Sequence, residues 1–207
     1  MKILFATRSP GKQREVRRIL ESAGHEVVFP DEAGVLESSA EELLENADSF
    51  QANARAKAEY FARRTGLPTI GDDSGLEVLS LGGAPGVRSK RWAAASGSTA
   101  QVDAANNAEL VRRLRGAPEN KRRARYRCVL VYLPRPDAVP QVFEASANGT
   151  ILEEPRGTGG FGYDPFFLSD ELEKSFAEAT AEEKDTASHR GKALKNLIES
   201  LASSLSP

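Results

Sequence analysis

The sequence predicts a single domain of the α/β class over residues 1–207. A strand, a helix and a second strand follow one another within about the first 30 residues, an order typical of parallel strands joined by a crossover helix. With 207 residues, 40% hydrophobic and 28% charged, the chain has the balance of a globular protein that buries its own core.

The first elements follow from the spacing of apolar residues. We expect a strand at Lys2 to Ala6, a helix from near Gly11, and a short strand at His25 to Phe29. The helix repeats apolar residues at the i, i+3, i+4, i+7 spacing of one face: Val16, Ile19, Leu20 and Ala23. This order predicts a βαβ unit and a partly parallel sheet.

After an acidic, irregular segment (30–45), the chain forms a helix and then extended segments. The apolar face of this second helix is made of Phe50, Ala54, Ala58 and Phe61. Gly66 ends the helix, and Pro68 to Gly71 enters a strand that we expect to end in Asp72-Asp73-Ser74-Gly75. Leu76 to Leu81 continues extended into a tight glycine-rich loop.

The second half of the chain adds two helices and two longer strands. A helix is expected over Thr99 to Arg115, with strands at Arg122 to Leu133 and Gln141 to Gly149. Thr180 to Glu183 fits a capping box. The last helix carries a continuous apolar stripe: Leu194, Leu197, Ile198, Leu201 and Leu205.

Charge and cysteine content exclude several classes of protein. Lys and Arg number 28 and Asp and Glu 30, and the net charge of −2 argues against a protein that coats nucleic acid or an anionic membrane. The single cysteine, Cys128, excludes an intramolecular disulfide and a multi-cysteine metal site. Cys128 to Leu133 is far shorter than the ~18 residues of a membrane span, and the apolar N-terminal run is too short for a signal peptide. We expect a cytoplasmic protein.

Thr7 to Lys12 lies where a strand passes into a helix, a position at which backbone N–H groups and the helix dipole attract anions. Lys12 adds a full positive charge. The segment is not a P-loop, because Ala6 replaces its first glycine and Gln13 its Mg²⁺-binding hydroxyl. It is either a phosphate cradle of another design or an ordinary turn with a solvent-facing lysine.

Asp72-Asp73-Ser74-Gly75 offers two neighbouring carboxylates. Such oxygen ligands suit Mg²⁺, which usually keeps waters and shares substrate phosphates. Adjacent side chains of a strand point to opposite faces, so both carboxylates reach one ion only if the strand bends, which Gly71 and Gly75 permit. The alternative is a turn in which aspartate bonds its own backbone.

Two later segments offer contacts to a nucleotide. Gly157 to Pro165 combines glycines, which let a backbone approach a ligand, with Phe161 and Tyr163, which offer faces for a base. Its alternative is a bulged loop whose aromatic side chains fold into the core. Lys184 and Ser188-His189-Arg190 suit phosphate and a keto oxygen, but they are equally typical of a surface helix start.

The alternating Arg123, Arg125 and Arg127 share one face of a predicted strand. Basic side chains near an aromatic residue suit RNA, so an RNA-binding module is one hypothesis. A solvated strand face agrees better with the acidic balance of the chain.

Taken together, these segments resemble the inosine/xanthosine triphosphate pyrophosphatase family. The parts that carry the resemblance are Ala6-Thr7 through Gly11-Lys12, Asp72 to Leu76, Leu81 to Val87, Gly157 to Pro165 and Ser188 to Leu194. Each motif alone is weak, but their order and spacing are highly specific and span nearly the whole chain.

The resemblance implies a two-lobed α/β fold with a long mixed β-sheet, flanking helices and a central active-site cleft, usually as a homodimer. It implies Mg²⁺-dependent hydrolysis of non-standard purine nucleoside triphosphates (dITP, ITP and XTP) to the monophosphate and pyrophosphate, which would cleanse the nucleotide pool. A nucleotide phosphohydrolase of different base specificity is the alternative. No nucleic-acid or membrane partner is expected.

The resemblance also assigns roles to residues. Thr7, Arg8, Ser9, Pro10, Gly11 and Lys12 would cradle the triphosphate. Asp73 would bind Mg²⁺ and serve as, or position, the base for the attacking water, with Asp72 in support and Ser74 touching the substrate. The nucleotide's base and sugar would be held by Phe161, Gly162, Tyr163 and Asp164. Lys184 would contact phosphate, while His189 and Arg190 would read the purine.

Two positions depart from the family pattern. Ser9 stands where asparagine is usual. Serine offers a hydroxyl but lacks part of the polar contact that the longer amide side chain would make. Counting back from Phe50 selects Glu45 as the second metal ligand, but Leu44 stands where a neighbouring glutamate is usual.

Overall fold

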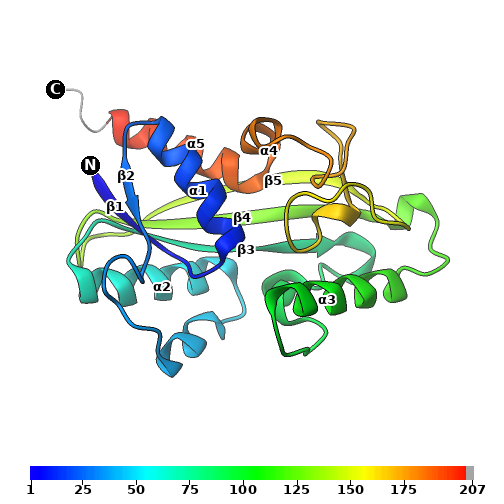
Figure 1. Ribbon diagram of the computed structural model, residues 1–207, viewed down its shortest axis with the longest axis horizontal. Coiled ribbons are helices and arrows are strands. Elements are labelled where there is room, and N and C mark those ends of the chain that lie inside the picture. The colour runs from blue at the N-terminus through cyan, green and yellow to red at the C-terminus, as the bar shows by residue number, and fades with distance from the viewer. Residues whose placement is uncertain (204–207) are drawn as a thin grey trace. The chain divides into compact units, whose positions relative to one another are not determined.

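The computed structural model describes residues 1–203, so Leu205 of the predicted stripe lies outside the described residues. The strands are β1 (Lys2–Ala6), β2 (Glu26–Val28), β3 (Thr69–Val78), β4 (Arg123–Leu133), β5 (Gln141–Ile151) and β6 (Phe167–Ser169). The helices are α1 (Pro10–Ser22), α2 (Phe50–Thr65), α3 (Thr99–Arg113), α4 (Ala181–Ala187) and α5 (His189–Ser203) (Figure 1). No helix in this part of the chain is long and apolar enough to cross a membrane.

The described strands form a mixed sheet. Their order is β2-β1-β3-β4-β5-β6. β1 pairs in parallel with both β2 and β3, and β5 pairs with β6 in antiparallel fashion. The predicted α/β class, the N-terminal βαβ unit and the mixed sheet flanked by helices are therefore confirmed.

The chain divides into two compact units. The first contains Met1–Asp73, Cys128–Ala145 and the chain from Arg190 onward, and the second contains Ser74–Arg127 and Ser146–His189. The strands β3, β4 and β5 contribute residues to both units. The predicted site residues are thus distributed over two units, with a boundary between Asp73 and Ser74.

The core of the first unit follows from the alternation of side chains along β1. Ile3 and Phe5 pack with Val16 and Leu20 of α1 and with a leucine stripe of α5. The intervening residues of β1 pack with Phe61 of α2. In this unit α1 and α5 therefore cover one face of the sheet and α2 covers the other (Figure 1). Ala23 is exposed, contrary to the predicted stripe, because α1 ends at Ser22.

In the second unit, α3 packs its apolar face against the sheet. Leu110 and Leu114 are buried together with Tyr126 and Phe167. The Tyr126 ring meets the Phe167 ring edge-on at 4.8 Å between centroids. Capping boxes start α3 at Ser98 and α4 at Thr180, the second as predicted.

The strand predicted to end at Asp72-Asp73-Ser74-Gly75 instead continues through these residues, and this prediction was wrong. β3 runs from Thr69 to Val78, so the two aspartates lie in mid-strand and form no Asx turn. Aspartate, serine and glycine are typical of turns, where the aspartate side chain bonds its own backbone. Here Asp72 instead pairs with Lys12 of α1, and Asp73 accepts a hydrogen bond from Asn53 of α2. The three-residue strand β6 was not predicted at all.

Gly71 allows α2 to approach β3 closely. A Cβ atom at this position would lie 2.0 Å from the carbonyl oxygen of Ala54 and 2.8 Å from the nitrogen of Ala58. Both atoms belong to the α2 backbone, so no side-chain movement relieves the clash. The glycine thus sets the distance between β3 and the helix that carries several site residues.

We expect Gly71→Ala to lower the free energy of unfolding by about 2 kcal/mol or more, because α2 must move away from β3. Urea denaturation followed by circular dichroism measures this change. Gln51→Ala, at an exposed position of the same helix, is the control and is expected to leave the midpoint unchanged. A wild-type midpoint for Gly71→Ala would contradict the close approach.

Candidate active site

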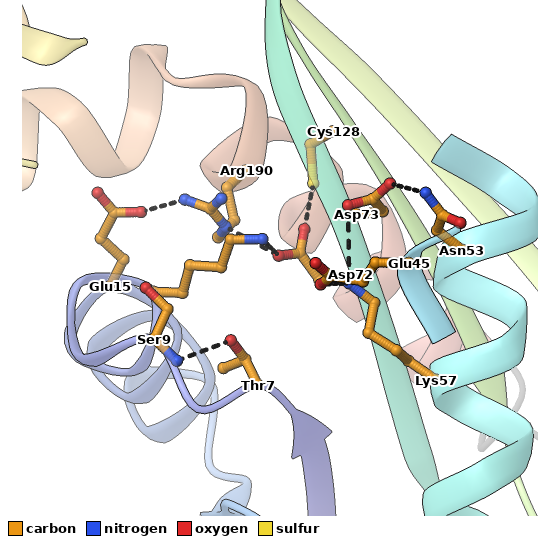
Figure 2. Close-up of polar contacts among 11 residues, drawn as sticks. Thr7, Ser9, Glu15, Glu45, Asn53, Lys57, Asp72, Asp73, Cys128 and Arg190 are labelled. Carbon is orange, nitrogen blue, oxygen red and sulfur yellow. Dashed lines mark hydrogen bonds and ion pairs between the residues drawn. The ribbon is translucent and has the colours of Figure 1, made fainter. Parts of the chain in front are cut away.

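The neighbouring carboxylates of Asp72 and Asp73 point to opposite faces of β3 in the first unit (Figure 2). Asp72 faces Lys12 of α1 and Arg190 of α5, and Asp73 faces α2. Because β3 continues through both residues, the two carboxylates have different hydrogen-bond and ion-pair partners and form two polar clusters.

The Asp72 cluster is a buried network of charges. Lys12 Nζ lies 2.5 Å from Asp72 Oδ2, and Arg190 Nε lies 3.7 Å from the same oxygen. The Cys128 thiol donates to Asp72 Oδ1 at 3.3 Å, while Arg190 Nη1 donates to Glu15 at 2.5 Å (Figure 2). Burial acts to raise the pKa of Asp72, but the charges of Lys12 and Arg190 outweigh it and hold the pKa well below its usual range. Asp72 is therefore a permanent anion.

The same burial keeps the Cys128 thiol protonated. Its pKa is raised well above the ordinary value, first by burial and then by the charge of Asp72. The thiol thus acts as a neutral hydrogen-bond donor to Asp72.

The Asp73 cluster joins two carboxylates through one lysine. Asn53 Nδ2 donates to Asp73 Oδ2 at 2.9 Å. Lys57 Nζ lies 2.8 Å from Glu45 Oε1 and 3.6 Å from Asp73 Oδ1. Glu45 ends a 3₁₀ helix (Ser39–Glu45), so its position depends on the loop before α2. The two metal ligands predicted from the sequence therefore converge on a single ammonium group.

The ionisation of this cluster reflects crowded charge. Burial raises the pKa of Asp73, and the nearby charge of Glu45 adds to the effect, although Lys57 opposes it. For Lys57 burial acts to lower the pKa, but Glu45, Asp73 and Asp72 together raise it. Burial and a second carboxylate both disfavour the anionic form of Asp73. A further positive charge nearby would therefore stabilise that form.

The donor set fits a divalent cation that keeps part of its own coordination shell. Within residues 1–203, no group of three or more His, Cys, Asp or Glu side chains is placed to hold a metal by itself. Two convergent carboxylates agree with Mg²⁺ chemistry, in which waters and substrate phosphates supply the remaining ligands.

The segment Thr7–Lys12 is held by its own side chains and by the acidic loop. The Ser9 N–H donates to Thr7 Oγ1 at 3.2 Å, and Pro10 and Gly11 open α1. The Arg8 guanidinium binds Glu41 at 2.8 Å and also contacts Asp31, pairs that raise its pKa. The alternative of a solvent-facing Lys12 is wrong, since only 17% of its side chain is exposed and its charge faces Asp72.

In the second unit, Asp164 closes the turn of the glycine-rich loop. Its Oδ2 accepts from the Phe161 N–H at 2.8 Å and from Lys184 Nζ at 2.5 Å. Lys184 Nζ also lies 4.8 Å from the centre of the Phe161 ring. Phe161, Asp164 and Lys184 are therefore brought together in the second unit.

Tyr163 differs from its neighbour Phe161, because it folds into the core. Its hydroxyl donates to the Ser89 carbonyl at 2.7 Å, and burial raises the pKa of this hydroxyl. The alternative that aromatic side chains of the loop are core residues therefore holds for Tyr163, whereas Phe161 is half-buried.

His189 and Arg190 are buried, with exposed fractions of 4% and 2%. The His189 ring stacks on Tyr126 at 4.6 Å with an interplanar angle of 5°. The alternative of a solvent-exposed helix start is therefore wrong. His189 belongs to the second unit and Arg190 to the first, and Ser74 also belongs to the second.

Comparison with known proteins identifies the family. The model of the Ham1 family matches residues 3–200. The chain belongs to the Ham1 family. The dITP/XTP pyrophosphatase of Yersinia pseudotuberculosis is 46% identical over 201 residues, covering 97% of this chain and 98% of the relative. The dITP/XTP pyrophosphatase of Thermus thermophilus is 43% identical over 199 residues, covering 96% of this chain and 91% of the relative. The HAM1 protein of Coxiella burnetii has the same fold, with a TM-score of 0.83 and 33% identity over 98% of this chain and 99% of that one.

These relatives confirm the resemblance to triphosphate pyrophosphatases that the motifs predicted. Three polar residues of the two clusters were not predicted from the sequence: Glu15, Asn53 and Lys57. Asn53 and Lys57 lie four residues apart beside Ala54 and Ala58, on the buried face of α2. The signal that would have found them is a polar residue that interrupts an apolar helix face.

The three alternating arginines of β4 (Arg123, Arg125 and Arg127) each lie near an acidic residue. Arg123 binds Asp170 at 2.5 Å, and Arg125 binds Glu77 at 2.5 Å. Arg127 lies 3.9 Å from Glu77. These pairs neutralise much of the charge that RNA binding would need, and they favour the interpretation as a solvated strand face.

Proposed function

We propose that this protein is a nucleoside triphosphate pyrophosphatase that hydrolyses dITP, ITP and XTP to the monophosphate and pyrophosphate. The observation that carries the proposal is the 46% identity over 97% of the chain with a relative named dITP/XTP pyrophosphatase. The carboxylates of Glu45 and Asp73 both lie near the Lys57 ammonium group, and this arrangement adds support. Phosphoryl transfer relies on positioned groups and on neutralisation of the phosphate charge.

We propose Glu45 and Asp73 as the residues that hold Mg²⁺. When bound, the ion would neutralise charge that develops on the phosphates. We propose that Asp73 also holds the attacking water. The hydrogen bond from Asn53 to one of its oxygens and its raised pKa, which favours proton acceptance, support this role. The water passes a proton to Asp73 as its oxygen forms a bond to the α-phosphorus, and the bond to the bridging oxygen breaks so that pyrophosphate leaves. Lys12 and the start of α1 supply positive charge for the triphosphate.

We propose that the segment Phe161 to Asp164 of the second unit holds the base and sugar, and that Lys184 contacts phosphate. His189 and Arg190 are proposed to read the purine. Hypoxanthine and xanthine present a 6-keto acceptor where adenine presents an amino donor. A donor such as Arg190 therefore pairs with the keto group, whereas the amino group of adenine finds no acceptor there. The binding free energies of the two bases would differ by about 1–3 kcal/mol.

A substrate panel with product identification tests this function. In the presence of Mg²⁺ we expect dITP, ITP and XTP to give the monophosphate and pyrophosphate. ATP is expected to be turned over at least about fivefold less, the lower end of the discrimination above. Anion-exchange chromatography separates pyrophosphate from orthophosphate. Release of orthophosphate would contradict the mechanism, and preference for a canonical nucleotide would favour a phosphohydrolase of different base specificity.

Three further features belong to the same proposal. Mg²⁺ is the cation we propose, a homodimer the assembly, and the cytoplasm the compartment, all from the resemblance. That β3, β4 and β5 belong to both compact units supports a single domain over residues 1–207.

A further inference from the structure

Two side chains of α3 form hydrogen bonds with Gly162 of the glycine-rich loop (Gly157 to Pro165). The Gly162 N–H donates to Asp103 Oδ2 at 2.9 Å. Asn107 Nδ2 donates to the Gly162 carbonyl at 2.9 Å. Asp103 and Asn107 are four residues apart, so they lie on the same face of the helix. All three residues belong to the second unit.

These two bonds fix the peptide groups on both sides of Gly162. The N–H belongs to the peptide that joins it to Phe161, and the carbonyl belongs to the peptide that joins it to Tyr163. Gly162 has a φ of 64°, in the left-handed region, so the backbone here makes a sharp turn. With both peptides held, the directions of Phe161 and of Asp164 depend on α3.

The helix that holds Gly162 is itself well anchored. Leu110 is fully buried, and a capping box at Ser98 starts the helix. Asn106 is buried and bonds both the Ala93 N–H and the Lys90 carbonyl at 2.9 Å. The burial of Leu110 and the hydrogen bonds of Asn106 therefore anchor α3 in the second unit.

The contacts of Asn107 are directed at the loop rather than at general packing. Its Nδ2 holds Gly162, whereas its buried Oδ1 has no hydrogen-bond partner within residues 1–203. An unpaired buried acceptor costs stability, so this amide orientation serves the bond to Gly162.

We propose that Asp103 and Asn107 are positioning residues that hold the loop of Phe161 to Asp164 in the orientation that binds the purine base. The inference rests on the proposed function and deepens it. The two residues act through Gly162 and are not themselves in contact with substrate. Because they orient the base-binding segment, their loss raises KM for the nucleotide and leaves kcat nearly unchanged.

The test compares Asp103→Ala and Asn107→Ala with wild type under saturating Mg²⁺. We expect KM for dITP to rise about tenfold in each variant, the effect of one lost hydrogen bond to a loop. The double variant is expected to lose little more, since both residues hold one glycine. Asp103→Asn keeps an acceptor for the Gly162 N–H and is expected to restore a KM near wild type. Arg112→Ala, exposed on the same helix, is the matched control.

Inhibition by inorganic tripolyphosphate separates base binding from phosphate binding. We expect its inhibition constant to be the same in wild type and variants, because the loop is assigned to the base. Equal losses for dITP and tripolyphosphate would overturn the inference by indicating general damage. Should an alanine variant fail to fold, Asn107→Asp replaces it, since the exchange removes the donor at nearly constant size.

Failure of the inference and failure of the proposed function give different results. Wild-type KM values in variants of an active enzyme overturn the positioning role alone. A wild-type protein that leaves dITP, ITP and XTP intact overturns the proposed function and this inference with it.

Discussion

Replacing Asp73 by asparagine is expected to reduce pyrophosphate release from dITP by about 10³-fold or more, the scale of loss when a group essential for transition-state stabilisation is removed. The amide removes the negative charge that would hold both the metal and the water, but it keeps the shape that Asn53 bonds. Burial already raises the pKa of Asp73, so the neutral side chain costs the fold little. Initial rates at saturating Mg²⁺, together with the thermal midpoint, measure the two effects.

Asp170→Asn is the control for this variant, because Asp170 is an exposed carboxylate that pairs with Arg123. We expect it to keep wild-type activity. Activity within tenfold of wild type for Asp73→Asn would remove Asp73 from the mechanism.

Replacing Arg190 by methionine is expected to lower the free energy of unfolding by about 3–5 kcal/mol, the usual cost of removing one partner from a buried ion pair. The change leaves Glu15 and Asp72 buried without the guanidinium that now lies 2.5 Å and 3.7 Å from them. Burial acts to lower the pKa of Arg190, but Asp72 and Glu15 raise it, so the charge is present at all working pH values. Urea denaturation curves give the change.

A second substitution separates the charge effect from lost packing. Glu15→Gln combined with Arg190→Met removes the stranded carboxylate, so we expect part of the lost stability to return. Arg112→Ala, an exposed arginine paired with Glu109, is expected to leave the curve unchanged. A loss below about 1 kcal/mol for Arg190→Met would mean that this pair is no stronger than an exposed one.

The elements with long periodic patterns were predictable from the sequence. α2 appears where the apolar spacing and Gly66 place it, because these signals are local. The path of β3 was not predictable in the same way. Its Asp-Asp-Ser-Gly run is typical of a turn. Pairing with the neighbouring strands β1 and β4, together with contacts to α1, α2 and α5, keeps it extended.

The candidate site was predictable where a motif is contiguous and hidden where it depends on packing. The glycine-rich loop, Lys184 and the Asp72-Asp73 pair stand out as runs of residues. Asn53 and Lys57 become neighbours of Asp73 only because Gly71 lets α2 lie against β3. Likewise, Asp103 and Asn107 meet Gly162 from more than 50 positions away in the chain, as their separations of 59 and 55 residues show.

The alternation along β3 makes the spacing of its residues as important as their identity. Gly71 and Asp73 face α2, while Ile70 and Asp72 face α1 and α5. β1 fixes this arrangement, since Ala6 lies opposite Gly71. Inserting or deleting one residue in this stretch would exchange the two faces, so that each carboxylate would meet the other's partners and a side chain would stand where only glycine fits. A substitution on this strand keeps the order of its two faces, whereas a change of length by one residue reverses it.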